Sequence, residues 1–168
     1  MSVEEFDRLI EEEFRYELDE GELITLTRPG VVHGRIERRL LVAIQRYLDA
    51  HPIGEVFGAD LLYVVGPATK RAPDVSIVLR DIEDEKEIHG APEIAAEILS
   101  PSNTRRAMER KLGQFFATGC KLAWIIDPKA RTVEVWVSAT GPVRTLGEHD
   151  SLETPLLPGF AFPISKLF

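Results

Sequence analysis

The chain has 168 residues and a formal net charge of −8, and its length predicts a single domain covering residues 1–168. Hydrophobic residues make up 44% and charged residues 29%, which excludes intrinsic disorder, and the single cysteine excludes a disulfide framework and a cysteine-rich zinc site. No apolar run approaches the roughly 20 residues that cross a bilayer, and the acidic N-terminus lacks a signal-peptide pattern, so we expect a cytoplasmic protein without membrane contacts.

The acidic excess is confined to the first segment of the chain. Residues 1–22 contain ten acidic and two basic side chains, whereas residues 23–168 contain 18 of each sign. Phosphate binding requires lysine and arginine. Because the body of the chain is neutral, the net charge does not exclude a nucleic-acid partner.

The N-terminal segment predicts a short helix followed by a β-hairpin. Ser2 and Glu5 have the spacing of a capping box, which begins a helix. The apolar face of this helix is formed by Phe6, Leu9 and Ile10. Two strand-like runs, 14–18 and 22–26, are joined by an acidic turn with a glycine, which is typical of a hairpin.

Two longer helices and five further strands are predicted from hydrophobic periodicity. A wide apolar stripe predicts a helix over residues 32–47, whose other face carries four arginines and one acidic residue. A second stripe predicts a helix over 103–118, with a glycine just after its end. Apolar or alternating runs predict strands over residues 61–65, 74–79, 94–99, 122–126 and 132–137, of which the last two form a hairpin.

The remaining segments are expected to be connections. We expect a polar turn between 66 and 73, a charged surface loop over 80–90, and a polar turn with a proline-rich closing segment after residue 138. The order of the elements predicts an α/β (α+β) fold. We expect a mixed β-sheet flanked by helices, with an N-terminal helix and β-hairpin.

Glu97 is the most informative single residue, because the strand that contains it is otherwise apolar. A buried carboxylate must be paired, bound to a cation or protonated, since uncompensated burial costs several kcal/mol. The alternative is a strand whose Glu97 side meets solvent or an arginine, and the pattern alone leaves the two interpretations open.

Asp74 and Lys111 are two further candidates. Asp74 follows a proline at the start of an apolar strand, and its alternative is an exposed turn acid. Two carboxylates that converge from neighbouring strands form a site for a hard cation, Mg²⁺ or Mn²⁺. Lys111 lies at the margin of an apolar helix face, where it either reaches a neighbouring site or extends toward water.

The residues around these candidates resemble the PD-(D/E)XK nuclease superfamily. Pro73-Asp74 and then Glu97-Ile98-Leu99 follow its pattern, except that Leu99 stands where the superfamily usually has a lysine. The chain is more similar to the Uma-type restriction-endonuclease family, in which the following helix supplies the lysine, here Lys111. Further matching motifs between Phe6 and Val137 are Tyr16-Glu17-Leu18, Gly21-Glu22-Leu23, His33-Gly34, Ser100-Pro101-Ser102, Gly119 and residues 124–128.

The resemblance implies a restriction-endonuclease-like core and a Mg²⁺- or Mn²⁺-dependent enzyme that hydrolyses DNA phosphodiester bonds. It implies that Asp74 and Glu97 hold the ion together with the backbone carbonyl of Ile98. Lys111 is implied to orient the attacking water or to stabilise the transition state. Glu17 and Glu37 are implied as acids at the periphery of the site.

The implied partner is nucleic acid, double-stranded DNA, which a small single domain would bind as a homodimer because the duplex is symmetric. His33, at the start of a helix, is expected to contact a phosphate or an acid. Phosphate contacts are expected from the arginines Arg35, Arg38, Arg39, Arg105, Arg106 and Arg110. Their alternative is an ordinary solvated helix face.

One departure from the family favours another function. Relatives often carry an acid between the Ser-Pro-Ser turn and the helix lysine, where this chain has Ala107. The alternative function is therefore a catalytically weakened or inactive nuclease fold, used as a nucleic-acid-binding or protein-interaction module. The acidic N-terminal segment favours the same alternative.

Overall fold

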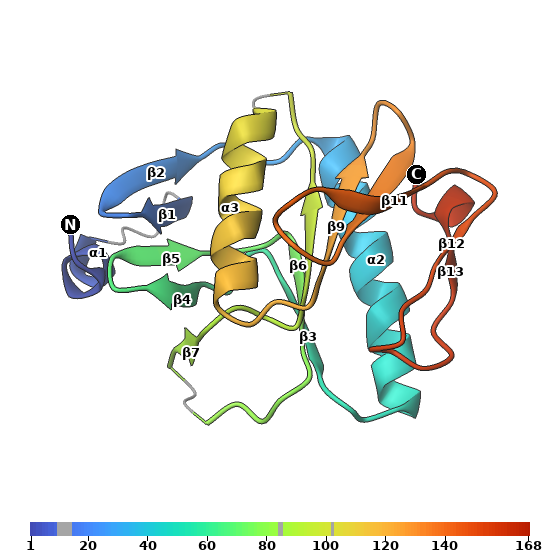
Figure 1. Ribbon diagram of the computed structural model, residues 1–168, viewed down its shortest axis with the longest axis horizontal. Helices are drawn as coiled ribbons and strands as arrows, with labels where there is room; N and C mark the ends of the chain where they lie inside the picture. The colour runs from blue at the N-terminus through green and yellow to red at the C-terminus, as the bar shows by residue number, and fades with distance from the viewer. Residues whose placement is uncertain (10–14, 84–85, 102) are drawn as a thin grey trace.

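The computed structural model describes residues 1–9, 15–83, 86–101 and 103–168, without the side chain of Leu9 (Figure 1). Three positions used above, Ile10, Phe14 and Ser102, lie outside the described residues. The helices of the described residues are α1 (Val3–Leu9), α2 (Val31–Ala50), α3 (Arg105–Ala117) and the 3-10 helix η1 (Ile164–Lys166). None of these helices has the length and hydropathy of a membrane-spanning segment.

The N-terminal helix and hairpin are confirmed. The capping box begins α1: the Ser2 N–H donates to Glu5 Oε2 at 2.8 Å, and the Glu5 N–H donates to Ser2 Oγ at 3.2 Å. Strands β1 (Arg15–Asp19) and β2 (Glu22–Leu26) pair antiparallel. The turn between them has positive φ at Glu20 and Gly21, 49° and 89°, as a tight hairpin turn requires.

A six-stranded sheet forms the centre of the fold. Its strands are β3 (Glu55–Gly58), β6 (Val75–Val78), β8 (Ile94–Ile98), β9 (Leu122–Asp127), β10 (Thr132–Trp136) and β11 (Pro142–Leu146). They lie in the order β11-β10-β9-β8-β6-β3, and only the β8–β9 pair among them is parallel. The predicted strands over 74–79, 94–99, 122–126 and 132–137 are confirmed as β6, β8, β9 and β10.

Helices α2 and α3 cover opposite faces of this sheet. Alternate residues of β8 separate into two buried clusters: Ile94 and Ala96 belong to the cluster that contains α2, and Ala95 belongs to the cluster that contains α3. The apolar stripe of α2 (Ile36, Leu40, Ile44, Leu48) and that of α3 (Met108, Leu112, Phe115) are both buried. The predicted mixed sheet flanked by helices is therefore confirmed.

A second, five-stranded sheet includes two strands in segments that the sequence assigns to connections. Besides β1 and β2, its strands are β4 (Tyr63–Gly66), β5 (Thr69–Arg71) and β7 (Ile88–His89), in the order β2-β1-β5-β4-β7. The expected polar turn at 66–73 contains β5, all of whose residues are buried. The expected surface loop at 80–90 contains β7, and its Ile88 is buried.

The C-terminal segment also differs from the expectation, because it is part of the core. It forms β11 and the pair β12 (Ser151–Leu152) with β13 (Phe162–Pro163). Figure 1 shows this segment in orange to red, and its last part runs alongside α2. Tyr47 Oη of α2 donates to the Pro158 carbonyl at 2.9 Å, and Arg39 Nη1 donates to the Leu167 carbonyl at 3.3 Å.

Candidate active site

The alternation of side chains along two strands brings the two predicted carboxylates to the same face of the sheet. In β8, Glu97 is two residues from Ala95, which packs with α3. In β6, Val78 also belongs to the cluster of α3, and Asp74 shares its parity. The β6–β8 register pairs Val75 with Ala96, so Asp74, the residue just before β6, lies beside Glu97.

Asp74 is held by one backbone donor and one side chain. The N–H of Ile98 donates to Asp74 Oδ2 at 2.7 Å, and His33 Nε2 lies 3.1 Å from Asp74 Oδ1. His33 stands in the first turn of α2, and this contact confirms that it touches an acid. The hydrogen bond to Asp74 raises the pKa of His33 above its ordinary value. The contact between Ile98 and Asp74 uses the backbone N–H of Ile98. The proposed role of the Ile98 carbonyl as a metal ligand remains a prediction.

Lys111 enters the site from α3, a helix capped by Thr104, whose Oγ1 accepts the Ala107 N–H at 3.2 Å. The ammonium Nζ lies 2.7 Å from Glu97 Oε1 and 2.8 Å from Glu17 Oε1, and it donates to the Ala72 carbonyl at 2.8 Å. The Lys111 side chain is only 13% exposed, so the alternative of a lysine that extends to water is excluded.

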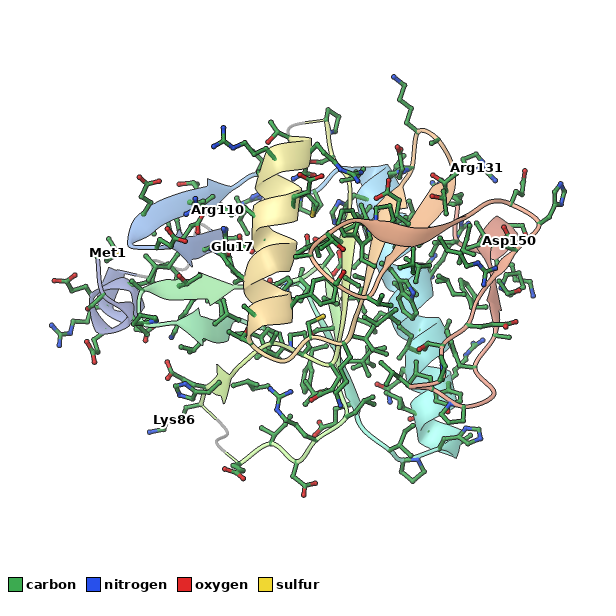
Figure 2. All side chains as sticks on the ribbon, in the orientation of Figure 1. Met1, Glu17, Lys86, Arg110, Arg131 and Asp150 are labelled. Atoms are coloured by element: carbon green, nitrogen blue, oxygen red, sulfur yellow. The ribbon has the colours of Figure 1, made fainter. Side chains whose placement is uncertain are left out.

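Glu17 of β1 is more central than the sequence implied. It is buried, and besides Lys111 it accepts hydrogen bonds from Arg71 Nη1 at 2.9 Å and from the Ala72 N–H at 3.0 Å. Figure 2 shows Glu17 between β1 and α3. Its signal in the sequence is the same as that of Glu97: an acid inside a strand-like run that buries its neighbours.

The electrostatics distinguish the two buried glutamates. Burial raises the pKa of Glu97 to about 8, and the charges of Asp74 and Glu17 act in the same direction, while Lys111 opposes them. Burial also acts to raise the pKa of Glu17, but Lys111, Arg71 and the Ala72 N–H outweigh it and lower that pKa. Burial disfavours the Lys111 ammonium, yet Glu97 and Glu17 raise its pKa above the ordinary value.

One cavity of about 630 Å³ lies beside the two strands that carry Asp74 and Glu97, and Glu17 is outside its lining. Asp74, Glu97 and Lys111 line it, and its walls are the end of β2 with residues 27–30 on one side and the start of α3 on the other. Arg15 and Arg28, which the sequence analysis did not select, also line it. In the described lining, Asp74 and Glu97 are the only acidic residues.

All six arginines predicted to contact phosphate lie outside this lining, namely Arg35, Arg38, Arg39, Arg105, Arg106 and Arg110. Arg35 and Arg106 are exposed on α2 and α3. Arg105 is ion-paired at 2.9 Å with both Glu109 and Glu134, and its guanidinium lies 5.1 Å from the centroid of the Trp136 ring. His33 does line the cavity.

The donor set fits Mg²⁺ or Mn²⁺. Oxygen ligands suit both ions, and Mg²⁺ is usually held by one or two carboxylates while it keeps several waters. Asp74 and Glu97 supply two carboxylates, and the contact described for the buried Glu97 Oε1 is the ion pair with Lys111 at 2.7 Å. The described residues contain no group of three or more His, Cys, Asp and Glu side chains placed to hold a metal ion, so these two carboxylates would be the side-chain ligands and waters would complete the coordination.

The raised pKa of Glu97 predicts a pH-dependent stability. Between the ordinary value of 4.5 and about 8, the folded state holds a proton on Glu97 that the unfolded state releases, so this residue removes stability as the pH rises through that window. The variant Glu97→Gln cannot ionise. In urea unfolding with EDTA at pH values from about 5 to about 9, we expect wild type to lose at least about 1 kcal/mol more stability than the variant. Parallel profiles would contradict this assignment.

Comparisons with known proteins agree with the fold. The family model Uma2, described as "Putative restriction endonuclease", matches residues 3–165. The chain is also similar to a crystal structure described as a putative nuclease belonging to DUF820 from Anabaena variabilis ATCC 29413, with a TM-score of 0.84 and 25% identity over 100% of this chain and 97% of that chain. A search of curated proteins finds no match. The chain therefore belongs to the Uma2 family and has the nuclease-like α+β fold that its sequence predicts.

Proposed function

We propose that the protein is a Mg²⁺- or Mn²⁺-dependent endonuclease that hydrolyses DNA phosphodiester bonds. One observation carries the proposal: Asp74, Glu97 and Lys111 line a single cavity, in which the ammonium of Lys111 lies 2.7 Å from the buried carboxylate of Glu97. A divalent cation would relieve the cost of burying two neighbouring carboxylates. The family match and the nuclease-like fold support the same reaction class.

Asp74 and Glu97 would hold the cation, and their neighbours orient them for this task. The Ile98 N–H and His33 each contact one oxygen of Asp74, which fixes the plane of that carboxylate. The chemistry that Mg²⁺ supplies when bound is acidification of water and neutralisation of phosphate charge. The Ile98 carbonyl is retained as a third proposed ligand, because Ile98 also lines the cavity.

Lys111 would act on the charge that develops in the reaction. Its ammonium stays protonated at neutral pH, because Glu97 and Glu17 raise its pKa. A fixed positive charge in a largely buried position stabilises the transition state of phosphoryl transfer far more than a mobile one in water. Its three N–H donors face Glu97, Glu17 and the Ala72 carbonyl, and the donor that faces Glu97 would orient the attacking water once the cation holds that carboxylate.

The cavity rim suits a phosphate backbone. Arg28 is exposed beside the cavity, and Arg15 lines it while pairing with Asp60 at 3.1 Å. Once a cation offsets the two carboxylates, the charged residues left in the lining are basic. We therefore propose Arg28 as a phosphate contact in addition to His33, Arg35, Arg105 and Arg106. A cytoplasmic homodimer on double-stranded DNA remains part of the proposal.

A second candidate function rests on Ala107. This residue lines the cavity at the position where relatives often carry an acid. The second candidate is a nuclease fold that binds nucleic acid, or another protein, without cleaving it.

Circular substrates distinguish these candidates. We expect wild type with Mg²⁺ or Mn²⁺ to nick a covalently closed DNA plasmid, and EDTA to stop the reaction, because the carboxylates need a cation to act on phosphate. The assay separates nicked, linear and closed forms on a gel, and circular single-stranded DNA and RNA serve as comparison substrates. Binding to the plasmid without any nicking would favour the second candidate.

A further inference from the structure

A row of buried charged side chains connects the five-stranded sheet to Lys111. Arg71 of β5 contacts Glu17 of β1, and Glu17 contacts Lys111 of α3, at 2.9 and 2.8 Å. Glu17 is 2% exposed and Arg71 is 4% exposed. Charges buried to this degree are stabilised only by close partners, so the three side chains depend on one another.

Glu17 is held firmly in this row, because both of its carboxylate oxygens accept hydrogen bonds or ion pairs. Oε2 accepts from Arg71 Nη1, and Oε1 accepts from the Ala72 N–H in addition to its ion pair with Lys111. Arg71 is itself fixed, since its Nη2 lies 2.7 Å from Asp19 and its Nε donates to Gln114 at 2.8 Å.

Glu97 differs from Glu17 in this respect. Lys111, at 2.7 Å from its Oε1, is the one hydrogen-bonding partner described for its side chain, whereas Glu17 has three. A divalent cation beside Asp74 would attract the same carboxylate more strongly than the single charge of Lys111 does. Lys111 therefore needs a second holder, and Glu17 with the Ala72 carbonyl supplies it.

We propose that Glu17 is the positioning residue of Lys111: Glu17, oriented by Arg71, keeps the ammonium beside the reaction centre when Glu97 binds the divalent cation. The proposal rests on the nuclease function proposed above. It assigns Glu17 a role through Lys111 rather than a contact with the substrate or the cation.

Glu93 provides a matched control. It is buried like Glu17, ion-paired with Arg80 at 2.7 Å, and accepts the Leu79 N–H at 2.8 Å. It therefore has the same kinds of partner, an arginine and a backbone N–H, but the partners described for it do not include Lys111, which is the partner that distinguishes Glu17. If the role of Glu17 were purely structural, Glu17→Gln and Glu93→Gln would have the same effect on kcat and on the labelling of Lys111.

The kinetic test compares these two variants on the closed plasmid with Mg²⁺. We expect Glu17→Gln to lower kcat by about tenfold to hundredfold with an unchanged KM for DNA, because a mispositioned charge affects the transition state alone. Glu93→Gln should keep the wild-type kcat. The conservative variant Glu17→Asp, which retains the charge, should recover part of the loss. Equal kcat values for Glu17→Gln and Glu93→Gln would overturn the positioning role.

A second measurement does not depend on nuclease activity. Trace acetylation with acetic anhydride, read by mass spectrometry, reports how firmly each amine is held. Lys70 is the internal reference, because it is buried and pairs with Asp7 and Glu87. We expect the labelling of Lys111 relative to Lys70 to rise about tenfold in Glu17→Gln and to stay constant in Glu93→Gln.

The outcomes separate the two proposals. If wild type cleaves no DNA, the proposed function fails, while the labelling ratio still tests the hold of Glu17 on Lys111. An unchanged labelling ratio in Glu17→Gln overturns the positioning proposal, whatever the activity. A raised ratio with an unchanged kcat overturns the catalytic part of it.

Discussion

The variant Glu97→Ala is expected to lose divalent-metal binding and to cleave DNA at least about a thousandfold more slowly than wild type. Glu97 is one of the two carboxylates proposed to hold the cation, and a metal contributes several kcal/mol to the stabilisation of a phosphoryl-transfer transition state. About 4 kcal/mol corresponds to a thousandfold in rate.

The fold should survive this substitution. Lys111 keeps Glu17 and the Ala72 carbonyl as partners, so the variant leaves no unpaired buried cation. Removal of Glu97 also eliminates a carboxyl group whose burial raises its pKa to about 8. Calorimetric titration with Mg²⁺ and Mn²⁺ measures the binding, and Glu93→Ala, a buried acid outside the cavity lining, is the control. Metal binding of wild-type affinity in Glu97→Ala would contradict the proposed ligand.

The variant Lys111→Ala is expected to separate metal binding from turnover. A cation can replace Lys111 as the partner of Glu97, so binding should be retained, while the rate should fall about a hundredfold to a thousandfold for loss of a preorganised charge. Glu17 retains Arg71 and the Ala72 N–H, which preserves its ionised state.

The measurement is a single-turnover cleavage rate at saturating Mg²⁺ together with the calorimetric titration. Lys121→Ala is the control, since Lys121 is exposed and lies just before β9, outside the cavity lining. A turnover in Lys111→Ala equal to that of the Lys121→Ala control would show that Lys111 has no part in the reaction.

The two carboxylates could be predicted from the sequence because strand periodicity is a local property. Glu97 stands out because it is an acid inside an otherwise apolar strand. Asp74 stands out because it is an acid at the beginning of the preceding apolar strand. That the two acids lie side by side follows from their parity and from the β6–β8 register. The sequence contains the parity, but the register depends on the assembled sheet.

Strand β5 could not be predicted, because its burial depends on distant partners. Lys70 in this strand pairs with Asp7, 63 positions away, and with Glu87, and Arg71 pairs with Glu17. Two adjacent cationic residues such as Lys70 and Arg71 are typical of a protein surface. Ion pairs with residues distant in the sequence offset the free-energy cost of burying them. The C-terminal segment was missed for a related reason: its buried residues, such as Leu157 and Phe160, are separated by prolines and show no period.

The acidic N-terminal segment neutralises basic side chains of the rest of the chain. Asp7 pairs with Lys70, Asp19 pairs with Arg71 and Arg110, and Glu20 pairs with Arg110. Figure 2 shows Arg110 and Glu17 on the same side of α3. This segment therefore holds basic residues of the body in place, and its truncation would remove the two acidic partners of the buried Arg71 and one of the two acidic partners of Lys70.

The central proposal is that the protein hydrolyses phosphodiester bonds in the cavity lined by Asp74, Glu97 and Lys111. Asp74 and Glu97 would hold the divalent cation for this reaction. Its most direct test is single-turnover cleavage of closed circular duplex DNA by wild type and Glu97→Ala, purified in parallel and assayed at the same Mg²⁺ concentration. We expect cleavage by wild type that EDTA stops, and no cleavage by Glu97→Ala above its own EDTA background. Equal rates for the two proteins would contradict the assignment of the site.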